Sequence, residues 1–100
     1  MADRYDPTAG LFGISVAAGM VGTGVQNLRA YEKAGLVDPQ RTPGGTRLYS
    51  MDDITRLRQI AALLDEGLNL VGIAMVLRLE ADNARLRHEI SEQRDHRRRT

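Results

Sequence analysis

The stretch ISVAAGMVGTGVQNLRAYEKAGLVDPQRTPGGTRLYS, residues 14–50, decides the fold of this chain. Its first residues place apolar side chains on one face of a short helix: Val16, Ala17, Met20 and Val21. The run Gly22-Thr23-Gly24 then interrupts the helical pattern with residues that tolerate a sharp reversal. A second helix is predicted from about residue 25 to residue 34, and Gly35 stands where a left-handed cap ends it.

The second predicted helix carries polar side chains that suit the major groove of DNA. Gln26 and Asn27 can pair with adenine edges, and Arg29 can bind guanine or a phosphate. Leu28 is predicted to face the core. Two short helices at a steep angle are typical of a helix-turn-helix motif, although small helical hairpins also occur as plain core.

A turn sequence follows in Arg41-Thr42-Pro43-Gly44-Gly45-Thr46-Arg47. It predicts a loop between two short extended segments, with an arginine on each side of the loop. We interpret this loop as a wing whose Arg41 and Arg47 approach phosphate or the minor groove. The alternative is that both arginines merely solubilise a turn. Gly44 and Gly45 are interpreted as turn residues, because they lack the strand and helix context of a nucleotide-binding loop.

The order of residues in this stretch resembles the winged-helix domain of MerR-type bacterial transcription regulators. The resemblance is carried by Leu28-Arg29-x-Tyr31-Glu32-x-x-Gly35-Leu36-Val37-x-Pro39, followed by Arg41, Gly44-Gly45, Arg47, Tyr49 and Ser50. The opening Ile14-Ser15-Val16-Ala17-Ala18 and the wing are most similar to the heat-shock repressor (HspR-like) branch. The family usually has Ser or His at position 24 and Thr at position 27, so Gly24 and Asn27 depart from its pattern.

The candidate DNA-binding residues come from the helices, the turn and the wing. The resemblance implies that Arg29 and Tyr31 contact backbone phosphates; the alternative is a surface arginine and a half-buried tyrosine. Ser15 is also a candidate N-cap of the first helix. The whole predicted set is Ser15, Thr23, Gln26, Asn27, Arg29, Tyr31, Lys33, Arg41, Gly44, Gly45 and Arg47.

Two further helices are predicted after the wing. Ser50-Met51-Asp52-Asp53 resembles a capping box that starts a third helix, which Gly67 ends, and Asn69 caps a fourth. From residue 76 a heptad pattern predicts a short dimerising helix, with Val76, Leu79, Asn83, Leu86 and Ile90 in the seam. Only about two heptads are apolar, so a helix folding back on its own head is the alternative. The family resemblance implies an antiparallel pair, and residues 95–100 are predicted to be a frayed basic end.

Composition restricts the class of protein. One hundred residues allow one small domain with an appendage. The net charge is only +1, but residues 14–50 carry four basic and two acidic groups and residues 81–100 carry six and four, so positive charge gathers at the head and the tail. The absence of cysteine excludes a disulfide, a thiolate metal site and a redox switch. No nucleophile has a base partner, and no cofactor site is expected, so we do not predict an enzyme.

The predicted fold is mainly α: a winged helix-turn-helix with a two-stranded wing, two supporting helices and a C-terminal dimerisation helix. Residues 1–13 are predicted to be a flexible N-terminal arm, residues 14–79 the winged-helix domain, and residues 80–100 a short coiled-coil dimerisation helix with a basic tail. The uncharged run at residues 11–25 is about 15 residues long, too short to span a membrane. Its acidic flank is wrong for secretion, so a cytoplasmic, nucleoid-associated location is expected.

We therefore predict a homodimeric repressor of heat-shock or chaperone genes that binds an inverted repeat in double-stranded DNA, one head per half-site. The resemblance adds an Hsp70-type chaperone as a possible partner; no membrane partner is expected. Since the chain ends soon after the dimer helix, no small-molecule inducer is expected. One alternative is a protein-interaction adaptor that holds a partner helix on residues 79–90. Another is an architectural, excisionase-like protein that bends DNA.

Overall fold

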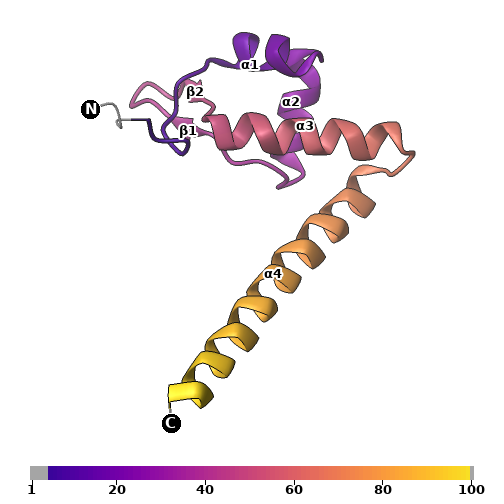
Figure 1. Cartoon of the computed structure of the whole chain (residues 1–100). Helices are drawn as coiled ribbons and strands as arrows, with labels where there is room; N and C mark the ends of the chain where they lie inside the picture. Colours follow the sequence, from indigo (N-terminus) through magenta and orange to yellow (C-terminus); the bar gives the residue numbers. More distant parts are fainter. Residues whose placement is uncertain (1–4, 100) are drawn as a thin grey trace.

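The computed structural model describes residues 5–99 and consists of a compact head and one long helix that leaves it (Figure 1). The head contains α1 (Ile14–Val21), α2 (Val25–Lys33), β1 (Gln40–Arg41), β2 (Arg47–Leu48) and α3 (Met51–Asp65). The long helix is α4 (Leu70–Arg99). This arrangement confirms the predicted winged fold, which is mainly helical with one two-stranded antiparallel sheet. No helix among the described residues is long and apolar enough to cross a membrane.

The helix-turn-helix forms where the sequence predicts it. Gly22 adopts φ +81°, a left-handed conformation that glycine tolerates, and its N–H caps α1 by donating to the carbonyl of Ala18. The predicted inner face of α1 is partly wrong, because Val16 is 55% exposed while Ala17 and Ala18 are buried. The small alanines allow α1 to pack closely against α2 and α3.

A second correction concerns the start of α1. The residue that precedes the helix is Gly13, and no side chain caps it. Ser15 is the second residue inside α1 and is exposed, so it is not the predicted N-cap. The first turn of α1 therefore depends on packing of its apolar neighbours rather than on a side-chain cap.

The end of α2 is closed as predicted. Gly35 has φ +77°, and its N–H donates to the carbonyl of Glu32 over 2.9 Å. The next N–H, of Leu36, donates to the carbonyl of Tyr31 over 2.9 Å, and the Leu36 side chain is buried. These two bonds with an apolar partner form a Schellman motif, which fixes how the chain leaves α2 for the wing.

The core lies between α3, the start of α4 and the inner face of the helix-turn-helix. The predicted capping box at the start of α3 is present, with Ser50 and Asp53 bonding each other's backbone N–H. The buried residues of α3 are Ile54, Leu57 and Ile60. The largest side chains that are fully buried are Tyr49, Leu28, Ile54, Leu57, Ile60 and Ile73.

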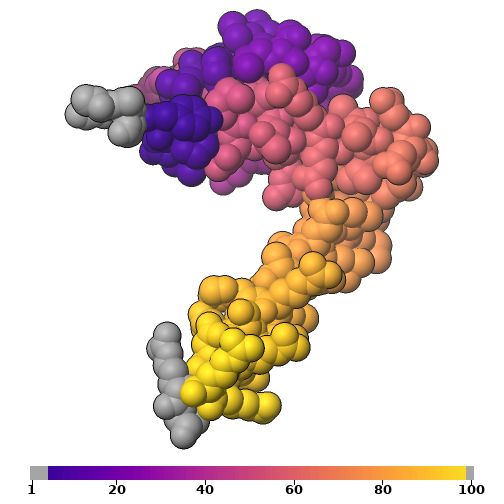
Figure 2. All heavy atoms as spheres, viewed as in Figure 1, coloured from indigo at the N-terminus to yellow at the C-terminus, as the bar shows by residue number. Residues whose placement is uncertain are grey.

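Helix α4 is one uninterrupted helix of 30 residues. It therefore joins two helices that were predicted separately, the fourth helix of the chain and the dimerisation helix. The predicted fraying of its end is wrong for residues 95–99, which are helical. Asn69 caps it as predicted by accepting from the N–H of Gly72 over 2.8 Å. Ile73 and Leu77 are buried against the head. Beyond them the helix stands away from the head as a rod (Figure 2).

The N-terminal segment, predicted to be a flexible arm, is hydrogen-bonded to the rest of the head over part of its length. Residues 6–12, which we call the strap, run across the base of the wing. Phe12 and Tyr49 form an isolated antiparallel bridge, in which the Tyr49 N–H donates to the Phe12 carbonyl over 2.7 Å. Gly10 donates its N–H to the side chain of Gln40 over 2.9 Å. The arm prediction also covers residues 1–4, which lie outside the described residues.

Candidate nucleic-acid interface

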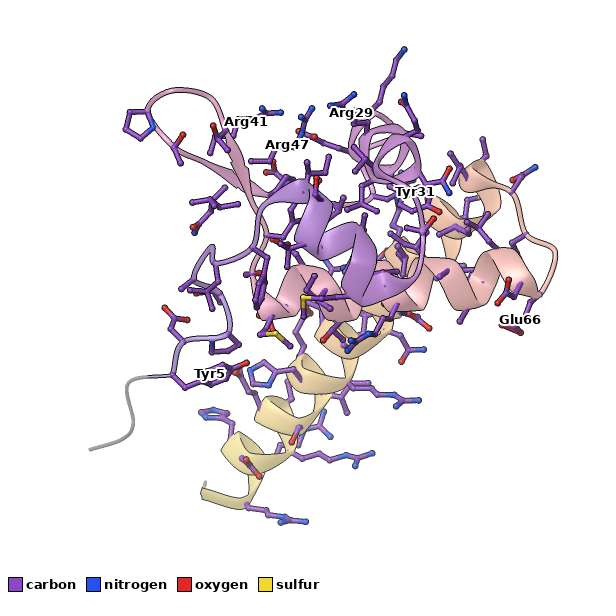
Figure 3. The ribbon with its side chains drawn as sticks, turned by 90° about the horizontal axis from the view of Figure 1, so that it is seen from above. Tyr5, Arg29, Tyr31, Arg41, Arg47 and Glu66 are labelled. Atoms are coloured by element: carbon purple, nitrogen blue, oxygen red, sulfur yellow. The ribbon has the colours of Figure 1, made fainter. Side chains whose placement is uncertain are left out.

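The polar face predicted on α2 is exposed. Gln26, Asn27, Arg29 and Lys33 all lie at the surface, while Leu28 between them is fully buried. Within residues 5–99 the guanidinium of Arg29 has no hydrogen bond or ion pair to occupy it. Figure 3 places Arg29 on the same side of the head as Arg41 and Arg47, while Tyr5 and Glu66 lie away from that side. Helix and wing thus present one basic face, as an interface to phosphate requires.

Two residues of the predicted set contact each other at the start of α2. The Nδ2 of Asn27 donates to the hydroxyl of Thr23 over 2.6 Å, one helical turn earlier. In this arrangement the amide nitrogen of Asn27 is the donor and the hydroxyl of Thr23 is the acceptor. The Oδ1 acceptor and the second N–H remain available, and these are the groups that a bidentate contact with adenine uses.

Tyr31 is placed differently from the other candidates. Its side chain is only 5% exposed and belongs to the core cluster. The ring therefore supports the inner side of α2, and it is buried more deeply than the half-buried tyrosine of the alternative. The phosphate contact implied for Tyr31 stays a prediction, limited to the edge of the ring that reaches the surface.

The wing is a minimal hairpin. Its two strands pair Gln40 with Leu48 and Arg41 with Arg47. The turn between them is closed by the N–H of Thr42, which donates to the carbonyl of Thr46 over 2.8 Å, and Gly45 adopts φ +88°. Gly44 and Gly45 are exposed at the tip and act as turn residues, in agreement with the sequence interpretation.

The two wing arginines are held by one carboxylate. The Nη2 of Arg41 lies 2.6 Å from one oxygen of Glu32, and the Nε of Arg47 lies 2.5 Å from the other. Arg41 also donates through Nη1 to the carbonyl of Gly45 over 3.2 Å, which ties the same side chain to the wing tip. We call Glu32, Arg41 and Arg47 the wing clamp. It links the wing to α2 across the interface.

The ion pairs shift the pKa values of Glu32 and Arg47. Chiefly the hydrogen bond from Arg47, with help from Arg41, lowers the pKa of the Glu32 carboxyl below its ordinary value despite partial burial. The bond to Glu32 likewise raises the pKa of Arg47. Both shifts favour the charged forms of Glu32 and Arg47 at neutral pH.

Glu32 was missed as a site residue by sequence reasoning, which quoted it only as part of the family motif. A signal was available, since a hairpin that pairs Arg41 with Arg47 places two like charges side by side and requires a nearby acid. Glu32 and Asp38 are the acidic residues of the stretch from residue 14 to residue 50. The distance from α2 to the wing could not be derived without the fold.

Tyr49 lies beneath the clamp with its hydroxyl buried and no hydrogen-bond partner among the described residues. Burial raises the pKa of this hydroxyl above its ordinary value. Among residues 5–99, no three His, Cys, Asp or Glu side chains gather as a possible metal site. The chemistry of this face is thus ionic and hydrogen-bonding.

Comparison with known proteins assigns the family. The model of the MerR HTH family of regulatory proteins matches residues 12–80. The chain belongs to the MerR family. One similar protein is HspR of Streptomyces coelicolor, named as a putative heat shock protein, which is 48% identical over 79% of this chain and 53% of its own length. The regulator GlnR of Bacillus cereus is 41% identical over 70% of this chain and 54% of its own length.

The chain therefore spans about half the length of these MerR-family relatives. A solved structure of a MerR-family transcriptional regulator from Bacillus cereus has the same fold, with a TM-score of 0.62 and 28% identity. The match covers 86% of this chain and 70% of that one. The matched family is one of regulatory proteins, and GlnR and the solved Bacillus cereus structure are named as transcriptional regulators, in agreement with the prediction that the chain is not an enzyme.

Proposed function

We propose that this MerR-family chain is a DNA-binding transcription regulator. The observation that carries the proposal is that the exposed Arg29 of α2 lies on the same side of the head as the wing arginines (Figure 3). In this view α2 enters the major groove with Gln26 and Asn27 toward base edges, and Arg29, Lys33 and the wing contact backbone phosphates. The exposed Ser15 and the half-buried Thr23 at the helix-turn-helix, with Gly44 and Gly45 at the wing tip, complete the predicted interface.

The proposal includes a homodimer that binds an inverted repeat in double-stranded DNA. Its support is the uncovered apolar stripe of α4, where Leu79, Leu86 and Ile90 are 63%, 50% and 49% exposed in the single chain. Val76 and Asn83 lie on the same stripe and line a shallow surface hollow of about 410 Å³. Apolar side chains at heptad spacing on an isolated helix are typical of a helix that pairs with another.

Within this proposal the regulator represses heat-shock or chaperone genes. The support is the 48% identity to HspR, a protein named for heat shock. Relatives such as GlnR carry other names, so the regulated genes are assigned by that one similarity. A co-repressor role for an Hsp70-type chaperone rests on the same similarity and requires a direct binding assay. A cytoplasmic location at the nucleoid follows from DNA as the ligand.

The test is selection of bound sequences from a random duplex pool at near-physiological salt, with the mass of the complex measured in parallel. Enrichment of an inverted repeat bound by two chains would support the proposal. Arg29→Ala should then weaken binding to all duplexes and reduce the salt dependence, whereas Gln26→Ala should mainly change the preferred sequence. If both variants bind like the wild type, the assignment of α2 to the groove is wrong.

The apolar stripe of α4 also supports a second candidate, a protein-interaction adaptor. A helix from another protein would then occupy the hollow lined by Val76, Leu79 and Asn83. This candidate predicts a monomer in solution and no enriched DNA sequence. An excisionase-like architectural role would instead give DNA bending without a defined palindrome.

A further inference from the structure

The wing clamp contains an acidic side chain on a surface that is proposed to bind DNA. The Glu32 side chain, which is 18% exposed, sits between the side chains of Arg41 and Arg47, which are 45% and 26% exposed. Glu32 thus places a negative charge within the face that would meet phosphates. The negative charge of Glu32 reduces the attraction of this face to DNA, unless Glu32 also has a structural role that favours binding by more than this cost.

The geometry of the clamp indicates what it contributes. Glu32 uses one oxygen for each arginine, so it bridges both strands of the hairpin at their paired position. Each strand has only two residues, and a hairpin this short is marginal alone. The remaining N–H donors of each guanidinium stay available, because a guanidinium carries five. Without the carboxylate, the two arginines would repel each other across the hairpin.

We propose that Glu32 is a positioning residue for DNA recognition. By holding Arg41 and Arg47 on α2, it fixes the wing relative to the groove-facing side of α2 before DNA binds, and it aims the free donors of both arginines at backbone phosphate. The proposal rests on the DNA-binding function proposed above. In this proposal the positions of Arg41 and Arg47 are fixed by their contacts within the head and not by contact with the nucleic acid.

The sign of one substitution separates positioning from simple masking of charge. Glu32→Gln removes a negative charge, so by electrostatics alone it should strengthen binding to every duplex. If Glu32 positions the wing, the same substitution should weaken binding to the selected duplex by about tenfold, the scale of one charge-assisted hydrogen bond. Binding to a shuffled duplex should be unchanged or slightly tighter. The ratio of the two affinities therefore falls.

The matched control is Glu66→Gln. Glu66 is exposed at the end of α3 and lies away from the wing, so this change removes the same charge without touching the clamp (Figure 3). It should alter both affinities alike. Glu32→Asp keeps the charge but shortens the side chain by one methylene, so it cannot bridge both guanidiniums, and it should also lower the affinity ratio. Affinities are read by fluorescence anisotropy with the two duplexes over a salt series.

A measurement without DNA keeps the proposal separate from the proposed function. In ¹⁵N relaxation of the free protein, Glu32→Gln should increase the fast motion of residues 42–46, and Glu66→Gln should not. If the fast motion of residues 42–46 is unchanged in Glu32→Gln, the proposal that Glu32 positions the wing is overturned. If Glu32→Gln binds both duplexes more tightly at an unchanged ratio, Glu32 only masks charge and the proposal is also overturned. A wild-type protein that prefers no duplex refutes the proposed function, and the clamp is then decided by relaxation alone.

Discussion

Truncating Leu86 to alanine tests the dimer at its apolar stripe. Leu86 is 50% exposed in the single chain, so about half of its side chain is left for a partner to cover. Full burial of a leucine side chain is favourable by about 1.5–3 kcal/mol, and the available half corresponds to about 1 kcal/mol. A symmetric dimer contains the residue twice, which gives about 2 kcal/mol, or about a thirtyfold weaker dimer. Helix propensity changes little, because alanine and leucine are both strong helix formers.

The assay is sedimentation equilibrium over a concentration series, with circular dichroism as the check on helix content. Ser91→Ala is the matched control, since Ser91 is exposed on α4 outside the predicted seam and should leave the dimer constant unchanged. The reasoning is refuted if the wild type is dimeric and Leu86→Ala dissociates at the same concentration. In that case the stripe is not the dimer contact.

Three further predictions concern the strap, the core and the clamp. Gly10→Ala would place a Cβ 2.7 Å from Oε1 of Gln40, and it should lower the free energy of unfolding by about 1–3 kcal/mol. The control is Gly13→Ala, whose Cβ would meet no atom within 4 Å and which should lower the free energy of unfolding by only a few tenths of a kcal/mol. Equal denaturation midpoints would refute this. Tyr49→Phe removes a buried hydroxyl that has no partner and should leave stability within about 1 kcal/mol or raise it; a larger loss would mean that the hydroxyl is bonded. The pKa of Glu32 is lowered, so its contribution to stability should be present above the ordinary glutamate range and should be lost as the pH falls through the lowered pKa. The difference in stability between wild type and Glu32→Gln should therefore shrink as the pH is lowered from neutral through and below the ordinary glutamate range.

The features that sequence predicted well are those with local causes. The left-handed glycines at positions 22, 35 and 67, the capping box at Ser50 and the cap at Asn69 each depend on a few consecutive residues. Their residue types are specific for their backbone geometry, so position and structure follow together. The buried Leu28 and the wing turn were predicted for the same reason.

The features that sequence missed depend on contacts between distant residues. Composition and turn residues made the N-terminal segment look flexible, but its backbone pairs with Tyr49, and its Gly10 meets a side chain 30 residues away. Backbone hydrogen bonds place almost no constraint on the identity of a side chain, so no periodicity in the sequence predicted the strap. The continuity of α4 was missed because its buried face changes from the head to open solvent near residue 77, which reads as two helices of different amphipathicity.

The strap and the clamp act on the same small hairpin from different sides. The strap bonds the side chain of Gln40 and the backbone of Tyr49, which lie at the base of the wing, while Glu32 holds the arginines of both strands against α2. A hairpin with two-residue strands that is bonded both to the strap and to Glu32 has little conformational entropy left to lose when it binds a ligand. Since ordering a loop on binding costs free energy, a wing fixed in advance would raise affinity without any added contact to DNA. This predicts that weakening the strap with Gly10→Ala and the clamp with Glu32→Gln will reduce sequence preference by more than the sum of the two changes in free energy, because each constraint alone still limits the hairpin.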